Sequence, residues 1–182
     1  MKTFESLNPA TGDVIGVFPQ TSAKEVDEAV AKANVASEHW ASLSFRKRGI
    51  ILRDWASMLT REIESSADLI HRETGKPISD ARLEVSIAIE HIGWAAKYAP
   101  KVLSDQSRPS GLLMFNMAAK VQRSAFGVIG IIGPWNYPFF TPIGSIAYAL
   151  AAGNTVVFKP SEFTPAVGSW LGESWKRIAP FA

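Results

Sequence analysis

The strongest constraint on the fold lies in the last third of the chain, where two short apolar runs are bounded by glycines. Val128–Ile132 and residues 155–158 have the length and composition of buried strands, and residues 142–150 between them have those of a helix. Thr164 followed by Pro165 is typical of a helix N-terminus. The order strand, helix, strand, helix predicts a parallel pair with a right-handed crossover, and therefore an α/β fold.

Apolar residues at helical spacing predict four helices, or three with one broken, before residue 100. Ser22 and Glu25 form a capping box, which starts a helix that runs to about His39. A second helical pattern includes Ile51 and continues until Gly75, which suits the position after a helix end.

The next helix is expected to begin at Ser79 or Asp80, either of which could cap it, and to end at Pro100. Proline interrupts a helix because it lacks a backbone N–H and clashes with the preceding turn. With this helix, residues 21–106 form a helical part of the chain.

Two other segments are expected to form hairpins. Residues 1–20 alternate apolar and polar side chains around a turn at residues 8–12, which predicts an N-terminal arm. Residues 107–126 form the second hairpin, with two short strands within residues 111–125 around a turn near Met117. An exposed, apolar pair of strands favours pairing between subunits, although packing against the chain's own core is an equally good explanation.

Composition and charge exclude several classes of protein. Lys and Arg number 19 and Asp and Glu 17, and this net charge of +2 is scattered along the chain, so we expect no nucleic-acid partner. A hydrophobic fraction of 47% with 20% charged residues is typical of an ordered globular protein. No apolar stretch approaches the roughly 20 residues that span a bilayer, and no signal-peptide pattern opens the chain. We therefore expect a cytoplasmic protein without a membrane partner.

The chain contains no cysteine. These residues therefore cannot form disulfides or thiolate metal sites, and they supply no cysteine nucleophile. His39, His71 and His91 lie in helical patterns without metal-ligand spacing, so we expect partly exposed helix residues and no metal site.

Two loops, residues 133–138 and 159–164, follow the carboxyl ends of the expected strands, where open α/β sheets bind ligands. Lys159 and Glu162 offer a donor and an acceptor suited to ribose hydroxyls, and Asn136 offers a neutral amide. Each also has an ordinary explanation, as a surface lysine, a helix-terminus glutamate and a turn asparagine. Neither loop contains GxGxxG or a P-loop. The residues alone leave the ligand open.

The same segments resemble the paired signatures of the aldehyde dehydrogenase superfamily. The strings are GVIGIIGPWNYP at residues 127–138 and GNTVVFKPSEFTP at residues 153–165, preceded by NPATG at residues 8–12 and ETGKP at residues 73–77. The resemblance covers almost the whole chain. It implies the N-terminal portion of that fold, incomplete because the catalytic domain is absent, with a Rossmann-like parallel βαβα unit.

The resemblance also implies a division of the chain. It consists of an N-terminal arm (1–20), the helical part of the cofactor-binding domain (21–106), a β-hairpin oligomerisation arm (107–126) and the βαβα part of the NAD(P)-binding domain (127–182). A homo-oligomer is implied for the complete subunit.

By the same resemblance, Asn136 is the side-chain donor of the oxyanion hole and is expected to bind the aldehyde oxygen as it becomes an alkoxide. The residues implied to bind the cofactor are Ile132, Pro134, Trp135, Lys159 and Glu162. We expect NAD to be preferred, with NADP possible, because the Glu162 carboxylate would repel a 2′-phosphate whereas Lys159 would attract it.

The implied reaction is the NAD(P)-dependent oxidation of an aldehyde to a carboxylic acid through a thioester. Because the family's catalytic cysteine and glutamate come from residues beyond this portion, we expect the isolated chain to be inactive. A truncated product acting as a binding or assembly module is an alternative. A reductase of acyl phosphates or acyl-CoA is a third, although PWNYP with KPSE fits the hydrolytic enzymes better.

Overall fold

The predicted βαβα unit forms the centre of the architecture. Strands β5 (Val128–Ile132) and β6 (Thr155–Lys159) are joined by helix α5 (Phe140–Ala151) and followed by helix α6 (Pro165–Ile178). The strands are parallel, with Val128 opposite Thr155 and Ile132 opposite Lys159. The predicted α/β class is confirmed, with an incomplete sheet of two strands.

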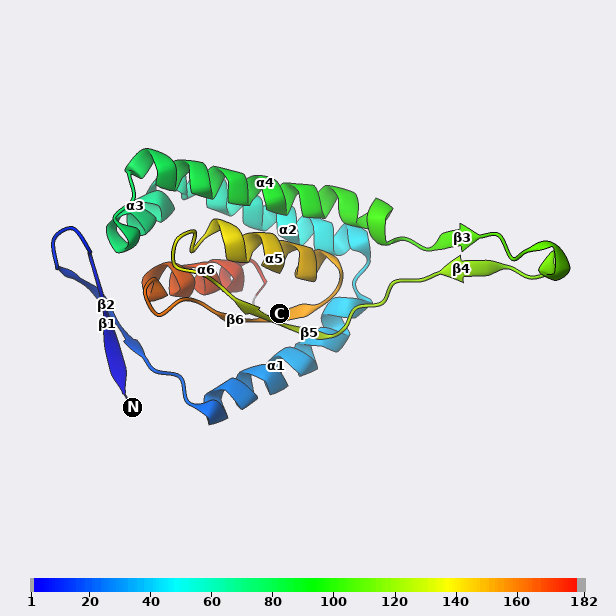
Figure 1. The fold of residues 1–182 in the computed structure, drawn as a ribbon, viewed down its shortest axis with the longest axis horizontal. Coiled ribbons are helices and arrows are strands. Elements are labelled where there is room, and N and C mark those ends of the chain that lie inside the picture. Colours follow the sequence, from blue (N-terminus) through cyan, green and yellow to red (C-terminus); the bar gives the residue numbers. More distant parts are fainter. Residues whose placement is uncertain (1, 180–182) are drawn as a thin grey trace.

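The structure is a computed structural model and describes residues 2–179. The remaining residues of the expected N-terminal arm and βαβα part, 1 and 180–182, lie outside this description. Figure 1 shows the element order along the chain.

The expected hairpin at the start of the chain is present. Strands β1 (Thr3–Leu7) and β2 (Val14–Pro19) pair antiparallel. Their turn is closed by the Gly12 amide, which donates to the Asn8 carbonyl at 2.8 Å, and by the Ala10 amide, which donates to the Asn8 side chain at 2.9 Å. An asparagine side chain that accepts from the backbone two residues on is a common turn device.

The four predicted helices are present within residues 23–103. They are α1 (Ala23–Ser42), α2 (Phe45–Arg61), α3 (Ile63–Thr74) and α4 (Ile78–Leu103). The capping box of Ser22 and Glu25 opens α1, and α3 ends at Gly75 with φ +74°, a left-handed conformation that glycine adopts without a Cβ clash. Both local predictions are confirmed.

Both predicted ends of α4 are wrong. The helix begins at Ile78 because the carbonyl of Pro77 accepts from the amides of Asp80 and Ala81 at 3.0 Å, so Ser79 and Asp80 lie in the first turn and cap nothing. The helix also continues past Pro100 to Leu103. Proline removes one backbone hydrogen bond from the helix, but its fixed φ is compatible with helical geometry, so Pro100 does not by itself end α4.

The second hairpin is present, but its first strand does not lie where the sequence pattern placed it. Strand β3 (Gln106–Arg108) pairs antiparallel with β4 (Ala119–Val121), and the apolar segment between them contains a 3₁₀ turn, η1 (Leu112–Met114). Gly111, with φ +85°, interrupts the extended chain just before this segment. The predicted first strand within residues 111–117 is therefore wrong.

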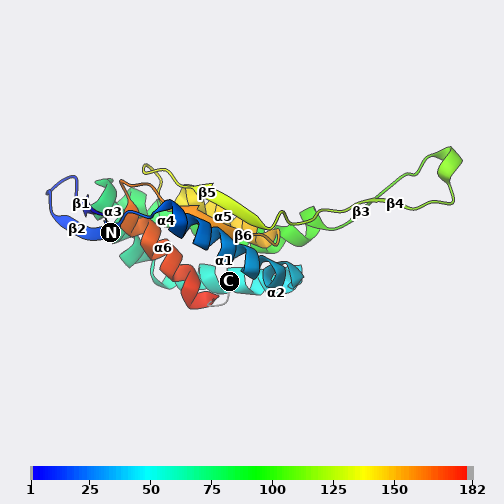
Figure 2. The same ribbon diagram turned by 90° about the horizontal axis from the view of Figure 1, so that it is seen from below.

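The apolar residues of this hairpin form its exposed tip. The residues Leu112, Leu113 and Phe115 are 89%, 92% and 85% exposed. Figures 1 and 2 show the hairpin projecting away from the helices, at the end opposite β1 and β2. Packing against the chain's own core, one of the two explanations open from the sequence, is wrong.

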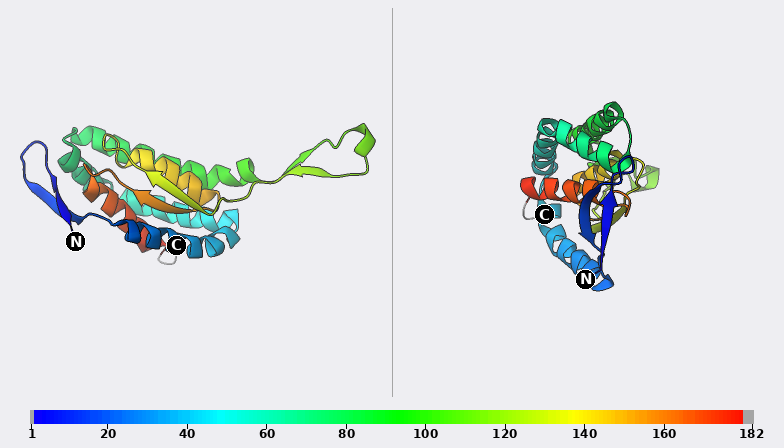
Figure 3. Two further views of the ribbon diagram at one scale, coloured as in Figure 1. Left: turned by 60° about the horizontal axis from the view of Figure 1, so that its bottom comes forward. Right: turned by 90° about the vertical axis from the view of Figure 1, so that its left-hand side faces the viewer.

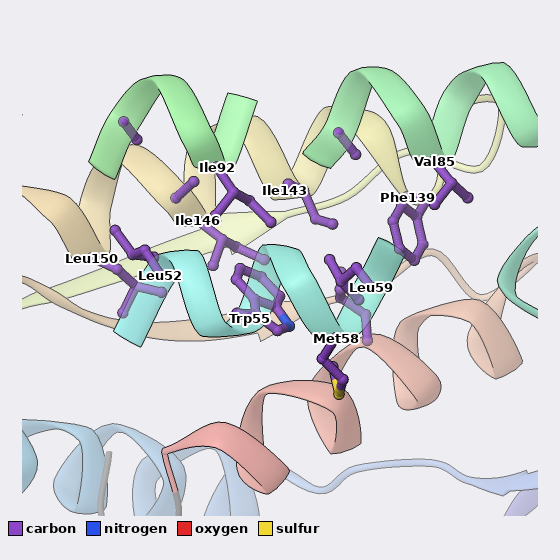
Figure 4. Packing of buried hydrophobic residues seen from close by; sticks show 14 of the residues in the cluster. Leu52, Trp55, Met58, Leu59, Val85, Ile92, Phe139, Ile143, Ile146 and Leu150 are labelled. Carbon is purple, nitrogen blue, oxygen red and sulfur yellow. The ribbon is translucent and has the colours of Figure 1, made fainter. Parts of the chain in front are cut away.

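The core lies between α2, α4 and α5. In Figure 4, Leu52, Trp55 and Leu59 of α2 point toward Ile92 of α4 and toward Ile143 of α5. Each of these five side chains is at most 1% exposed, and full burial of one such side chain contributes about 1.5–3 kcal/mol. This packing anchors α5 against α2 and α4, and α5 follows the loop after β5.

The strand pair lies between α4 on one side of the molecule and α1 on the other (Figures 1 and 3). Helices α1 and α5 both contact β5 and β6. On β6, the Thr155 hydroxyl donates to the Ala33 carbonyl of α1 at 2.9 Å. None of the helices described within residues 2–179 is long and apolar enough to cross a bilayer.

Candidate active site

The two loops that follow β5 and β6 share one edge of the strand pair. Ile132 ends β5 directly opposite Lys159, the last residue of β6, and the Gly133 amide donates to the Lys159 carbonyl at 2.9 Å. Ile132 is 81% exposed. The parallel arrangement therefore presents both predicted ligand loops side by side, as their positions in the sequence predicted.

Lys159 and Glu162 form an ion pair on this edge. The Lys159 Nζ lies 3.1 Å from Glu162 Oε2, and both side chains are more than half exposed. A hydrogen bond from the backbone of Glu162 itself, and then one from Lys159, lower the pKa of the Glu162 carboxyl. The pair thus presents a cationic donor and an ionised acceptor to solvent, which suits ribose hydroxyls but is also common among surface residues.

The turn after β5 carries the predicted amide. Trp135, Asn136 and Tyr137 are exposed, whereas Pro134 is half-buried. The side chain of Asn136 has no hydrogen-bond partner among residues 2–179, so its amide is free to meet a ligand. Its main-chain carbonyl accepts a hydrogen bond from Lys76 Nζ at 2.8 Å.

A buried glutamate on α4, Glu84, accepts hydrogen bonds from the backbone at the end of this turn. The sequence analysis did not identify it. Glu84 Oε1 accepts from the amides of Phe139 and Phe140 at 2.9 and 3.1 Å, and Glu84 Oε2 pairs with Lys76. These amides belong to the start of α5, where backbone donors lack helical partners. The sequence does contain one signal for this residue. Glu84 is a charged residue on the apolar stripe of its helix, between the buried Ala81 and Val85.

A second buried glutamate, Glu73, caps α6. Its carboxylate accepts from the amides of Ala166 and Val167, both at 2.8 Å, and from the hydroxyl of Ser6 on β1. Thr164 precedes the helix as predicted but does not cap it. With φ −138° and ψ 51° it lies outside the usual capping conformation, and its buried hydroxyl has no partner within residues 2–179.

The loop after β6 also packs closely against α6. A Cβ atom at Gly168 would lie 2.2 Å from Cβ of Pro160, so only glycine permits this approach. The close contact and the Glu73 cap together fix the path of the chain from Lys159 into α6.

These contacts limit where an anion could bind at the starts of α5 and α6. Phosphates commonly bind at helix N-termini, but the first amides of α5 and α6 already donate to Glu84 and Glu73. A pyrophosphate therefore has no free amides at these two helix starts, which agrees with the absence of a GxGxxG fingerprint. The ion pair of Lys159 and Glu162, by contrast, is exposed to solvent.

Within residues 2–179, His, Asp and Glu side chains form no group of three that could hold a metal ion. The three histidines lie on helices. His39 and His71 are exposed, and the ring of half-buried His91 is hydrogen-bonded to the Tyr148 hydroxyl at 2.7 Å.

Comparison with known proteins identifies the family. The model of the aldehyde dehydrogenase family matches residues 1–179. An N-succinylglutamate 5-semialdehyde dehydrogenase from Burkholderia orbicola is 40% identical over 176 residues, which are 95% of this chain and 35% of the relative. The chain therefore spans about a third of the length of the curated relatives that it matches.

Similar solved structures point to the same family. A glyceraldehyde-3-phosphate dehydrogenase from Methanocaldococcus jannaschii, in complex with NADP, is 31% identical with a TM-score of 0.89. An NAD-dependent benzaldehyde dehydrogenase from Corynebacterium glutamicum has the same identity and TM-score. Each match covers 97% of this chain and 38% of the other. This chain belongs to the aldehyde dehydrogenase family.

Proposed function

We propose that this chain is the cofactor-binding portion of an enzyme that oxidises an aldehyde to a carboxylic acid with NAD(P)⁺, and that Asn136 stabilises the oxyanion. The observation that carries the proposal is the exposure and the hydrogen bonding of Asn136. Its side chain is exposed and unpaired among residues 2–179, while its backbone is bound to a buried ion pair. A donor held in this way suits charge that develops during a reaction.

In the proposed reaction a cysteine thiolate adds to the aldehyde carbon, and the carbonyl oxygen becomes an alkoxide. The Asn136 amide donates a hydrogen bond to that oxygen. Loss of hydride from the carbon gives a thioester, and water then hydrolyses the thioester to the acid and the free thiol. Bound NAD(P)⁺ supplies the hydride acceptor. Since residues 1–182 contain no cysteine, the thiolate comes from outside them.

The same proposal assigns the cofactor contacts. Lys159 and Glu162 bind the adenosine ribose, and Ile132, Pro134 and Trp135 line the cleft. The related structures include both an NADP complex and an NAD-dependent enzyme. The ionised Glu162 carboxylate supports a preference for NAD⁺ here, because it would repel a 2′-phosphate. We place the reaction in the cytoplasm.

The cofactor preference can be tested in a completed subunit, which we define as residues 1–182 fused to the remaining portion of the Burkholderia orbicola relative. Glu162→Gln is expected to narrow the ratio of kcat/KM for NAD⁺ over NADP⁺, because it removes the repulsion. Lys159→Ala is expected to weaken the binding of both NAD⁺ and NADP⁺. Initial rates with each cofactor give the ratio; an unchanged ratio in Glu162→Gln would show that this carboxylate does not face the ribose.

The isolated chain is expected to oxidise no aldehyde and to show no thiol-dependent esterase activity, since it has no cysteine to acylate. Reduction of NAD⁺ and hydrolysis of an activated ester can both be followed by absorbance. Turnover that survives removal of host enzymes, and that scales with the amount of this chain, would contradict the proposal.

A second candidate function is assembly without catalysis. The exposed tip of the β3–β4 hairpin supports it, because large exposed apolar patches mark contacts between proteins. The same tip supports a homo-oligomer of the complete subunit. If this chain acts as an assembly module, the isolated chain is expected to associate through the exposed tip, and a strictly monomeric isolated chain in sedimentation would contradict this candidate.

A further inference from the structure

One ion pair binds the Asn136 turn on both of its sides. Lys76 Nζ donates to the Asn136 carbonyl at 2.8 Å, while Glu84 accepts from the amides of Phe139 and Phe140. Lys76 and Glu84 are also bonded to each other. The carbonyl at the start of the turn and the amides at its end are therefore connected through two side chains.

This pair is largely removed from water. The side chain of Glu84 is fully buried, and that of Lys76 is 16% exposed. The Lys76 ammonium also lies 4.4 Å from the centre of the Tyr137 ring, a cation–π distance. Buried ion pairs are costly to form, and their best-supported benefit is to select one arrangement of the groups around them.

Capping of α5 explains only half of the arrangement. Glu84 alone satisfies the Phe139 and Phe140 amides, whereas the bond from Lys76 to the Asn136 carbonyl adds nothing to the helix. Since the Asn136 side chain has no partner among residues 2–179, the described contacts hold only the backbone from which this side chain projects, and Lys76 contacts that backbone directly. A misplacement of about 1 Å can cost about 10² in rate.

We propose that Lys76 and Glu84 are positioning residues for the Asn136 amide, acting through the backbone of its turn. The inference rests on the proposed oxyanion role of Asn136. Neither side chain touches the substrate. Their function is to keep the turn in a single conformation, so that the amide is in place before the alkoxide forms.

The first test uses this chain alone and does not depend on activity. Backbone amide hydrogen exchange is measured by NMR in Lys76→Met and in a matched control, Arg82→Met, which removes an exposed ion pair between Arg82 of α4 and Glu64 of α3. Lys76→Met is expected to accelerate exchange at Phe139 and Phe140 by about tenfold or more, because an opening cost lowered by about 1.4 kcal/mol corresponds to a factor of ten.

The control is expected to leave these two amides unchanged, and the amides of α2 are expected to keep their protection in both variants. Glu84→Gln, which retains an acceptor but weakens the attraction for Lys76, is expected to give an intermediate acceleration. Unchanged exchange at Phe139 and Phe140 in Lys76→Met would overturn the proposal. So would equal acceleration throughout the chain, because that would show a general loss of stability.

The second test measures kinetics in the completed subunit. Lys76→Met is expected to lower kcat by about tenfold to a hundredfold with little change in the cofactor KM, and Lys76→Arg is expected to restore part of the loss. In an Asn136→Ala background, Lys76→Met should cause almost no further loss. Equal losses in both backgrounds would overturn the proposal, whereas full turnover in Asn136→Ala alone would overturn the oxyanion role itself.

Discussion

Asn136→Ala is expected to lower the turnover of the completed subunit by about 10²–10³, the usual loss when one oxyanion donor is removed. Because the amide meets charge that develops only during the reaction, cofactor binding is expected to change little. The backbone of the turn keeps its bonds to Lys76 and Glu84, which do not involve the Asn136 side chain. Steady-state rates and cofactor titration by fluorescence measure the two quantities separately.

A matched control is Asn34→Ala, which removes an exposed asparagine from α1. It is expected to leave both turnover and cofactor binding unchanged. If Asn136→Ala weakened cofactor binding as much as turnover, Asn136 would be a residue that holds the turn, and the oxyanion role would be wrong.

Glu84→Ala is expected to have the largest effect on stability, a loss of about 3–5 kcal/mol in the free energy of unfolding. The change leaves the amides of Phe139 and Phe140 without their acceptor and leaves the largely buried Lys76 ammonium without its counter-charge. It also removes the packing contacts of the Glu84 side chain, which is fully buried. Chemical denaturation of this chain, followed by circular dichroism, measures the loss.

The control for this variant is Glu64→Ala, which removes the exposed partner of Arg82. Its expected cost is about 0–1 kcal/mol, because solvent screens an exposed ion pair. Equal costs for the two variants would show that the Glu84 carboxylate contributes no more than an ordinary surface charge.

Local signals in the sequence were sufficient for most of the fold. The capping box of Ser22 and Glu25, the glycine at 75 and the order of the βαβα unit all depend on residues close together in the chain. These signals failed at two places, the first strand of the second hairpin and the ends of α4. Gly111, with its positive φ, stands at the start of the segment expected to be a strand, and this segment forms a 3₁₀ turn instead. Helix α4 continues past Pro100 to Leu103.

Only part of the candidate site could be predicted from local signals in the sequence. The side-by-side position of the loops after β5 and β6 follows from parallel strands, so the sequence could predict it. The roles assigned to Asn136, Lys159 and Glu162 came from the resemblance to the family and stay predictions.

The sequence by itself determined the α/β class, the family and the loops that carry the proposed ligand contacts, because each depends on short patterns. Only the tertiary structure decided how those loops are held. Glu84 binds amides 55 and 56 residues away, and Glu73 binds amides 93 and 94 residues away. In the sequence both lie in helical patterns, and nothing there indicates which amides they bind. They become caps because helix packing buries them beside unpaired backbone donors, where a carboxylate is stable only if it accepts hydrogen bonds.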